Sequence, residues 1–318
     1  MGNLQFSSDL LDDILFRAGE PVDGTSDFHA QALIDLNRAY RAMWMGGGEF
    51  VKDMNEPWLW LKKSTPGILT LQPYDESGTI SVTNNSASAT LSATRATDLD
   101  GWFLKVDSHG DIFRISAHTA GSAALTLDGV YTGTTNSAAA FRLFKLEYAL
   151  AADLLRLIAP MRCYSDNIDR IEGIDLYALD RDYPLMYADA GTPDKFALVT
   201  DTTVRFNRYG GNISTDLRRI EYDYHYRPAD LTDGASEEPV IPREHRQVLA
   251  DCALFNLLTT MSSAKAEAIG LQAKGGLQAM AADNRKKLSQ LSSRMGHISP
   301  RGAPQGRTLR TTNGLVIR

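Results

Sequence analysis

Apolar residues recur every three or four positions in the first 45 residues of the chain, which is the spacing of one face of an α-helix. The residues at this spacing are Leu10, Leu11, Ile14, Leu15 and Ala18, followed by Leu33, Leu36, Tyr40 and Met43. The pattern predicts two helices. Ser8 is the expected N-cap of the first helix, and Gly19 is expected to close it. The second helix is expected to begin near Ser26 and to end at the three glycines of residues 46–48.

The period changes from helix to strand after residue 57. Residues 58–63 and 68–72 flank the turn sequence "STPG" and predict a β-hairpin. Six further strand-like segments follow between residues 77 and 144: "TISVT", "ATLSA", "GWFLKVD", "DIFRISA", "AALTLD" and "AAFRLF". Short strands at this spacing predict an antiparallel sandwich or barrel. The polar faces of these strands carry Ser and Thr rather than Lys and Glu, so the sequence indicates no ligand pocket there.

The pattern stays β-like up to residue 242 and becomes helical after it. Near residue 220 an apolar residue and three tyrosines, Ile220, Tyr222, Tyr224 and Tyr226, alternate with charged or polar residues as in a strand. Helical spacing returns at Arg243. A second long helix is expected over about residues 263–295, with one stripe formed by Leu277, Met280, Leu288, Leu291 and Met295. The pair Gly275-Gly276 predicts a kink or a break in that helix.

These elements predict an α+β protein. Residues 1–56 and 243–295 should form a helical core, because each terminal helix shows a single apolar face that needs a partner. Residues 57–76 and 141–242 form the expected central antiparallel β region. Residues 77–140 are expected as an inserted small β-sandwich or barrel, and residues 296–318 as an extended basic tail, rich in Gly, Pro and Arg and disordered in isolation.

Charge is distributed unevenly along the chain. The 318 residues carry a net charge of −6, yet residues 285–318 hold eight of the 33 basic residues and none of the 39 acidic ones, which leaves 25 − 39 = −14 for the rest. An acidic body with a basic end is typical of an interaction tail. Two cysteines give no disulfide framework, the N-terminus does not resemble a signal peptide, and no apolar run approaches membrane-spanning length. We therefore expect a cytosolically made protein that is not embedded in a membrane.

Catalytic and metal-binding motifs are missing from the sequence. It contains no phosphate-binding, dinucleotide-binding or nucleophile-elbow motif, and none of its six histidines is spaced as a metal ligand. Glu244-His245 could act as an acid and base, and Asp9, Asp12 and Asp13 could bind a cation, but a structural role in helix starts is favoured for both. A short Asp98 to Asp100 segment is interpreted as a turn. We expect no catalytic residue, no metal and no cofactor, and therefore no enzyme.

Two features leave a binding role open. The alternating tyrosines near residue 224 could stack on bases or sugars, although a place in a core or an interface is favoured. The basic tail could bind nucleic acid or, as we favour, a protein surface. Its end, "NGLVIR", contains three consecutive apolar residues that could add a strand to a partner's sheet, which purely electrostatic DNA binding would not need.

Several sequence segments together resemble the head-to-tail adaptor (connector) proteins of tailed bacteriophages. They are "ALIDLNRAYRAM" in the second helix, "LDGVYTG" within the inserted module, "GTPDKFAL" before a strand, and "YDYHYRPADL" followed by "PVIP" before the last helices. The resemblance covers about residues 8–295. One departure lies in "YALAAD", residues 148–153, where Ala151 replaces a proline of the family pattern while Asp153 is kept. The sequence therefore does not predict the conformation of the turn at this position.

The resemblance implies a ring, usually of twelve copies, that docks under the portal protein in the virion neck and joins the capsid to tail or nozzle proteins. Genomic DNA would pass through its channel without specific binding, which suits an acidic body. The tail would dock into the portal and fold on binding. The implied portal-binding residues are Arg301, Arg307, Arg310, Leu315, Val316, Ile317 and Arg318.

A tail-associated binding protein is the alternative, with the inserted module recognising a host glycan or holding tail fibres. Trp102 and Phe103 are neighbours in one strand, so they cannot point to the same side of it. An exposed one of the two, flanked by polar groups, would favour glycan binding.

Overall fold

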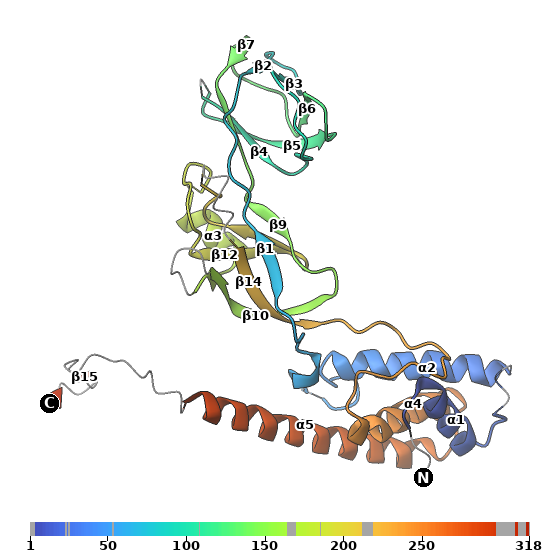
Figure 1. The fold of residues 1–318 in the computed structure, drawn as a ribbon. Helices are drawn as coiled ribbons and strands as arrows, with labels where there is room; N and C mark the ends of the chain where they lie inside the picture. The colour runs from blue at the N-terminus through green and yellow to red at the C-terminus, as the bar shows by residue number, and fades with distance from the viewer. Residues whose placement is uncertain are drawn as a thin grey trace. The chain divides into compact units, whose positions relative to one another are not determined.

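The computed structural model describes residues 4–22, 24, 26–52, 54–107, 109–163, 170–184, 186–211 and 219–296, and residues 309–310 and 316–317. The chain separates into two compact units. Unit 1 combines Met1–Leu61 with Pro228–Arg318, and unit 2 is Lys62–Arg227. The described residues form five α-helices and several mainly antiparallel sheets, so the mixed α+β class expected from the sequence is confirmed (Figure 1).

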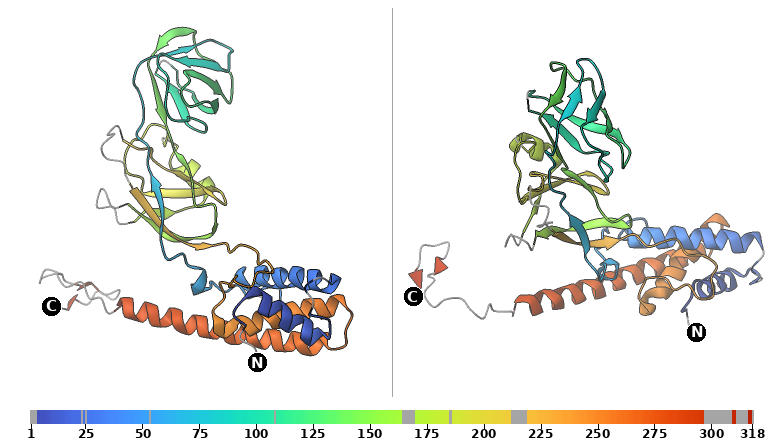
Figure 2. Two further views of the ribbon diagram at one scale, coloured as in Figure 1. Left: turned by 45° about the vertical axis from the view of Figure 1, so that its right-hand side comes forward. Right: turned by 45° about the horizontal axis from the view of Figure 1, so that its top comes forward.

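Unit 1 is built from helices. They are α1 (Ser7–Ala18), α2 (Asp27–Trp44), the 3-10 turns η1 (Leu59–Leu61) and η2 (Arg243–His245), α4 (Arg246–Thr260) and α5 (Ala266–Gly296). Helix α4 contacts α1, α2 and α5. Its residues on every side are therefore buried, including Leu249, Cys252 and Leu257. Helix α5 continues past the other three helices of the unit, as both views of Figure 2 show.

The helix ends follow the expected capping chemistry with one correction. Gly19 adopts a positive φ of 88° and donates its N–H to the carbonyls of Leu15 and Phe16, as a C-terminal cap should. The Ser26 hydroxyl accepts from the N–H of His29. Helix α1, however, begins at Ser7, and the carboxylate of Asp9 caps it by accepting from the N–H of Phe6 at 2.9 Å. Ser8 is not the N-cap, because a carboxylate one residue later satisfies the free N–H group.

Two buried charged side chains on α4 join the halves of unit 1. The Asp251 carboxylate accepts from Arg17 of α1 at 2.8 Å and from Gln272 of α5 at 3.0 Å. The Arg246 guanidinium donates to the carbonyls of Pro239 and Ile241 at 3.0 and 3.1 Å, and to the carbonyl of Gln5 near the N-terminus. Burying these charges is tolerable only because each one is paired or hydrogen-bonded.

Helix α5 passes through Gly275 and Gly276 without interruption, so the predicted break is wrong. The glycines of this helix serve close packing instead. A Cβ at Gly276 would lie 3.0 Å from Val248 of α4, and one at Gly270 would lie 2.8 Å from the Phe255 ring. Gly275 faces open space, since a Cβ there would meet nothing within 4 Å. Gly270 and Gly276 therefore let α4 and α5 approach closely.

Unit 2 contains a nearly closed β-barrel (Figure 1). Its strands are β2 (Ile80–Val82), β3 (Ser88–Leu91), β4 (Phe103–Val106), β5 (Ile112–His118), β6 (Ala124–Leu127), β7 (Asn136–Ala139) and β8 (Phe141–Phe144). They pair in the order β7-β2-β3-β6-β5-β4-β8. Only Ala140 separates the two outermost strands in sequence, so one continuous segment lies at both edges of the sheet. The barrel sheet thus extends beyond residue 140, which was the expected limit of the inserted module.

The rest of unit 2 is a two-layer sandwich with one helix. One sheet has the order β1-β14-β10 and the other β11-β12-β13-β9. The elements are β1 (Gly67–Thr70), β9 (Glu147–Ala149), β10 (Leu154–Cys163), β11 (Glu172–Gly173), α3 (Leu176–Asp182), β12 (Lys195–Thr200), β13 (Thr203–Phe206) and β14 (Arg219–Tyr226). Side chains from both sheets, such as Leu69, Phe206 and Tyr222, share one hydrophobic core.

The predicted hairpin over residues 58–72 does not form. Residues 59–61 make a 3-10 turn, and β1 pairs with β14 instead of with the preceding segment. Lys62 also bridges to His225 of β14. Both segments therefore lie along the same distant strand. The sequence "STPG" does separate the two extended segments, as predicted. A local pattern does not show which distant strand each segment pairs with.

A second hydrophobic core connects the barrel to the four-stranded sheet. It contains Phe103 and Phe144 of the barrel, with Leu179 of α3, Ala197 of β12 and Tyr209. Trp102 lies in the barrel core, and its neighbour Phe103 lies in this second core. Adjacent strand residues point to opposite sides, so both rings are buried, at 6% and 7% exposed. Neither gives the exposed aromatic that would have favoured glycan binding.

None of the described helices is both long enough and apolar enough to cross a membrane.

We predict that Asp251→Ala lowers the free energy of unfolding of unit 1 by about 2–4 kcal/mol, because Arg17 and Gln272 both lose the buried carboxylate between α1 and α5, and Arg17 keeps only its pair with Asp13 in its own helix. Urea denaturation followed by circular dichroism measures the change. Asp12→Ala, on the exposed side of α1, is the control and should shift stability by less than about 0.5 kcal/mol. Equal effects of the two substitutions would show that Asp251 does not hold the helices together.

The glycines of α5 give a second, internally matched test. Gly275→Ala should stabilise the protein by about 0.5–1 kcal/mol, because alanine is the better helix former and has room there. Gly276→Ala has the same helical gain but presses on Val248, and should be less stable than Gly275→Ala by about 1 kcal/mol or more. Thermal unfolding of the two variants side by side measures the difference. Equal melting temperatures would contradict the close α4–α5 contact.

Candidate functional site

The implied portal-binding residues lie at the very end of the chain. Arg301, Arg307, Leu315 and Arg318 fall outside the described residues. Arg310 belongs to β15 (Leu309–Arg310), and Val316 and Ile317 form β16 (Val316–Ile317). These strands pair antiparallel, with Leu309 opposite Ile317 and Arg310 opposite Val316. The four described residues beyond residue 296 thus lie in β-strands, and the rest of the predicted extended tail falls outside the described residues.

Helix α5 precedes this segment in the sequence, and its side chains are described as far as residue 290. Leu277 and Met280 are buried as predicted, and the last buried position is Asn284. The Asn284 amide donates to Glu56 at 2.7 Å and accepts from the N–H of Leu59 at 2.9 Å. Leu288 is partly exposed, whereas the side chains of Leu291 and Met295 lie outside the described part. From residue 285 to 290 no side chain is buried.

Sequence segments that carry the adaptor resemblance meet one another in unit 1. Asn37 of the "ALIDLNRAYRAM" segment accepts from the N–H of Leu231 at 2.7 Å and donates to its carbonyl at 2.9 Å. Leu231 is the last residue of "YDYHYRPADL". The Tyr40 hydroxyl accepts from the N–H of Val240, in "PVIP", at 3.2 Å. A side chain that pairs with both backbone groups of a distant residue fixes its position, so these motif residues are structural.

The "LDGVYTG" segment is likewise structural. Leu127 and Tyr131 are buried in the barrel core. Gly133 lies against the ring of Tyr131, where a Cβ would come within 2.4 Å of the hydroxyl. The Asp128 carboxylate accepts from the N–H of Arg114 at 3.1 Å. In this segment Leu127 ends a strand and Tyr131 fills the barrel core. Gly133 has no side chain, so the backbone there can lie directly against the Tyr131 ring.

The "YALAAD" turn forms without its proline. The N–H of Leu154 donates to the carbonyl of Ala151 at 3.0 Å, and the N–H of Ala151 donates to the hydroxyl of Tyr222 at 2.8 Å. Asp153 accepts from Lys63 at 2.8 Å and from the Tyr224 hydroxyl at 3.0 Å. The Lys63 hydrogen bond holds the pKa of Asp153 below its ordinary value. Tyr222 and Tyr224 are buried in the sandwich core, which confirms the favoured core interpretation of the tyrosine row and leaves them unable to stack on bases.

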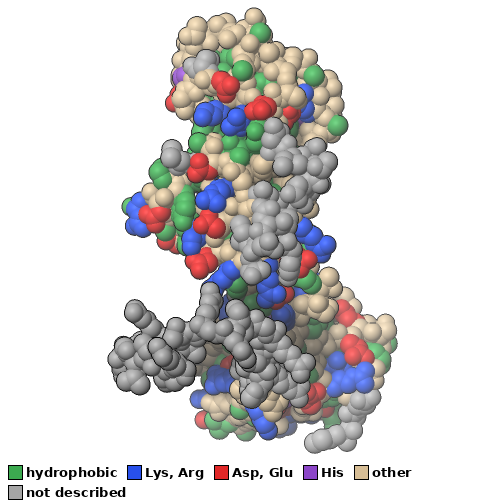
Figure 3. Space-filling model, turned by 60° about the vertical axis from the view of Figure 1, so that its left-hand side comes forward, with side chains coloured by type: hydrophobic (Ala, Val, Ile, Leu, Met, Phe, Trp, Pro, Cys, Tyr) green, Lys and Arg blue, Asp and Glu red, His purple; other side chains and the backbone are tan. Residues whose placement is uncertain are grey.

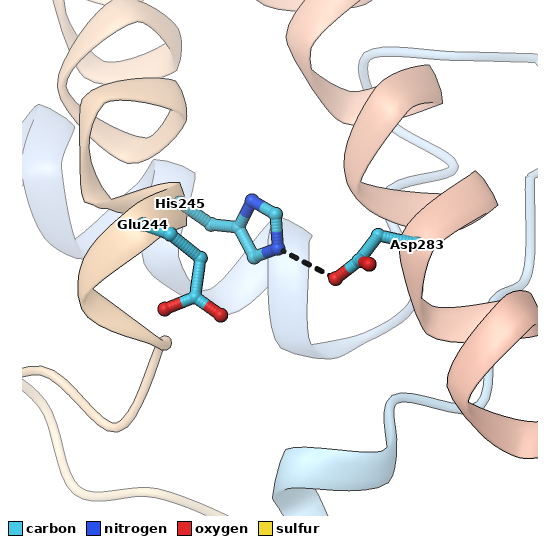
Figure 4. A group of neighbouring side chains, drawn as sticks. All are labelled: Glu244, His245 and Asp283. Carbon is cyan, nitrogen blue, oxygen red and sulfur yellow. Dashed lines mark hydrogen bonds and ion pairs between the residues drawn. The ribbon is translucent and has the colours of Figure 1, made fainter.

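One group of titratable side chains has the spacing of a metal site. Glu244 and His245 of η2 and Asp283 of α5 place their ligand atoms within 4.8 Å of one another (Figure 4). His245 Nε2 lies 3.3 Å from Asp283. The Lys287 ammonium, however, lies 2.8 Å from Asp283 and 3.3 Å from Glu244. Its hydrogen bond lowers the pKa of Asp283, and the two carboxylates raise the pKa of Lys287.

The ammonium of Lys287 thus supplies the positive charge that a metal ion would otherwise bring. These four side chains form an ion-pair network that joins the start of α4 to α5. The residues that line the adjoining pocket include no Ser, Thr or Cys. The favoured structural reading of Glu244-His245 is consistent with this geometry. An apolar pocket of about 170 Å³ lies beside it, lined by Trp58, Trp60 and Met280.

The remaining candidates also have structural partners. His29 is buried on α2 and contacts Asp233 at 2.8 Å. The N–H of Asp100 donates to Asp98 at 3.1 Å, which is the turn expected there. Cys163 is buried and not in a disulfide.

Comparison with known proteins gives no identification. A scan against protein-family models finds no family that matches the chain, and a search of curated proteins finds no significant match.

We predict that neither EDTA nor added Zn²⁺ changes the melting temperature of the protein, because Lys287 neutralises the only three-residue group of this spacing in the described chain. Differential scanning calorimetry measures it. Lys287→Met removes the competing ammonium and serves as the comparison. Stabilisation of the unaltered protein by Zn²⁺, lost in His245→Ala, would show that the group is a metal site after all.

Proposed function

We propose that the protein is a head-to-tail adaptor of a tailed bacteriophage. In this proposal several copies form a ring, of twelve in the family pattern, below the portal in the virion neck. The helices from the two ends of the chain form the helical core of each subunit and line the DNA channel. The C-terminal segment docks into the portal, and the other face of the ring receives tail or nozzle proteins.

The observation that carries the proposal is that sequence segments resembling the adaptor family contact one another in unit 1. Asn37 and Tyr40 come from the second helix of the family pattern, and Leu231 and Val240 from the segment before the last helices. About 190 residues separate Asn37 from Leu231, yet they share two hydrogen bonds. A chance likeness of loose sequence patterns would not require such contacts. The family pattern is thereby supported as a description of one packed structure.

Charge supports the same proposal. The basic residues from position 285 onward begin just after Asn284, the last buried residue among the described side chains of α5. Within this segment Arg285 and Lys287 pair with Glu56 and Glu244 of unit 1, and the basic residues beyond them have the charge to bind an acidic partner. The remaining chain, at −14, would repel DNA phosphates and let the genome pass.

The barrel fits a peripheral role in such a ring. Its core is apolar, and the face of the barrel seen in Figure 3 carries mainly uncharged side chains and backbone, with charged side chains near the sandwich. A surface of this kind can contact neighbouring copies or tail components without catalytic groups. We infer a structural virion protein rather than an enzyme.

Removal of residues 297–318 tests the proposal. The shortened chain should keep its fold, measured by circular dichroism, because the described contacts between α5 and the rest of unit 1, including those of Arg285 and Lys287, all lie before residue 297. It should lose binding to the portal protein of the same phage, measured by co-sedimentation and by cryo-electron microscopy of the mixture. The full chain should form rings on the portal.

A charge variant separates the tail's chemistry from its length. Replacing Arg301, Arg307, Arg310 and Arg318 by Gln should weaken portal binding at least tenfold and reduce its salt dependence. Four Ser→Ala changes at Ser289, Ser292, Ser293 and Ser299 form a control that keeps the charge. Normal docking by the truncated chain would overturn the tail assignment, and absence of any ring on the portal would overturn the adaptor proposal itself.

A further inference from the structure

A groove of about 550 Å³ lies where the barrel meets the four-stranded sheet. This volume falls in the range of about 300–1,000 Å³ that small-molecule sites occupy, and such sites favour the junctions of structural parts. The barrel contributes Asp111, Arg114 and Asp128 to the lining, and the sandwich side contributes Glu147, Tyr187 and Arg205. The two sets come from segments that the sequence pattern assigns to different domains, residues 77–140 and residues 141–242.

The hydrogen-bond donors of the groove are held in fixed positions. Glu147 is only 8% exposed and accepts from Arg205 at 2.7 Å and from Arg114 at 3.0 Å, one arginine on each carboxylate oxygen. Asp180 accepts a further bond from Arg205 at 3.1 Å. The Arg114 side chain remains 51% exposed. It uses a single N–H of its five in the bond to Glu147, so a fixed guanidinium offers further donors to the groove.

The acceptors are also held in place. The Asp111 carboxylate, 63% exposed, contacts His109 at 2.9 Å and accepts from the Thr132 hydroxyl at 2.9 Å through the same oxygen. The hydrogen bond from Thr132, aided by that from His109, holds the pKa of Asp111 below its ordinary value, so it stays ionised in mild acid. Asp128 likewise uses one oxygen, Oδ1, for the N–H of Arg114. Each carboxylate keeps its other oxygen available.

An aromatic surface completes the groove. The Tyr187 ring is half-buried and packs 5.4 Å from that of Phe103 and 6.4 Å from that of Phe144. Burial raises the pKa of Tyr187, so its hydroxyl stays protonated. A rigid, partly exposed ring beside carboxylate acceptors and guanidinium donors is suited to a molecule with an apolar face and an edge of hydroxyl groups.

We propose that this groove binds a neutral saccharide of one to three sugar rings. Neighbouring hydroxyls of a sugar can accept from Arg114 while donating to Asp111 or Asp128, and its C–H face can lie on Tyr187. The three carboxylates and two guanidinium groups of the lining leave one net negative charge, which disfavours phosphates and other polyanions. The inference does not depend on the adaptor proposal, because either an adaptor or a tail-associated protein could carry the site.

The test uses the full-length chain and a panel of neutral mono-, di- and trisaccharides built from glucose, galactose, mannose, rhamnose and N-acetylglucosamine. Saturation-transfer NMR detects binding, and titration calorimetry of the best sugar measures a Kd expected near about 1 mM. Asp111→Ala and Arg114→Gln should each weaken binding about tenfold or more, which corresponds to the loss of one charge-assisted hydrogen bond. Tyr187→Phe keeps the ring and should retain most of the affinity.

Asp182→Ala, an exposed carboxylate on α3 away from the groove, is the matched control and should bind normally. Affinity should be the same in low and high salt, as expected of an uncharged ligand. The proposal is overturned if no sugar of the panel gives a signal, if binding survives both Asp111→Ala and Arg114→Gln, or if only anionic compounds bind. Portal docking by the same variants should remain intact, so failure here leaves the adaptor proposal standing.

Discussion

Unit 1 depends on one constraint: helix α4 has almost no side that faces water. A helix of this kind cannot be covered by its neighbours in sequence alone. It needs α5, which follows it, and also α1 and α2, which precede it by some 200 residues. The buried charges of α4 act in the same way, because Asp251 binds α1 and α5 while Arg246 binds the N-terminal backbone. The first and last parts of the chain must therefore fold together.

This constraint makes the long β insertion tolerable. The chain passes from unit 1 into unit 2 after Leu61 and re-enters unit 1 at Pro228. The two hydrogen bonds between Asn37 and Leu231 hold the re-entering segment close to α2. The insertion keeps its own cores, so its size has little effect on the packing around α4. Within unit 2, the same logic appears at Trp102 and Phe103, which serve two different cores from adjacent positions. One strand thereby joins the barrel to the sandwich.

Local signals in the sequence predicted what local physics decides. The sequence predicts the cap at Gly19 and the start of a helix near Ser26, because both depend on groups within one turn, but it misplaces the cap of α1 at Ser8. Six of the seven barrel strands are predicted from alternation between interior and outside, and β7, of whose side chains only Ala139 is buried, is not. Pairing between distant segments was not predictable: β1 was assigned to the wrong partner, and its true partner β14 lies about 150 residues further on. Local propensity predicts a helix break at Gly275-Gly276. The reason for Gly276, its close contact with Val248, depends on how α4 and α5 pack and is not visible in the sequence.

The same distinction explains what could be foreseen of function. A catalytic site can be recognised from sequence when its reactive groups stand at a known spacing, whereas the charged groups that the described residues bring together around Asp283 and around Glu147 come from separate segments of the chain. The groove differs from the ion-pair network in how its carboxylates are used, not in exposure, because the Lys287 side chain is 45% exposed and that of Arg114 is 51% exposed. Lys287 pairs with both carboxylates of the network, whereas Asp111 keeps one oxygen available after its internal bonds are made. Polar groups that are already fixed and still reachable by solvent bind a ligand with little further ordering, and this is the physical reason to look for a ligand at the seam between barrel and sandwich.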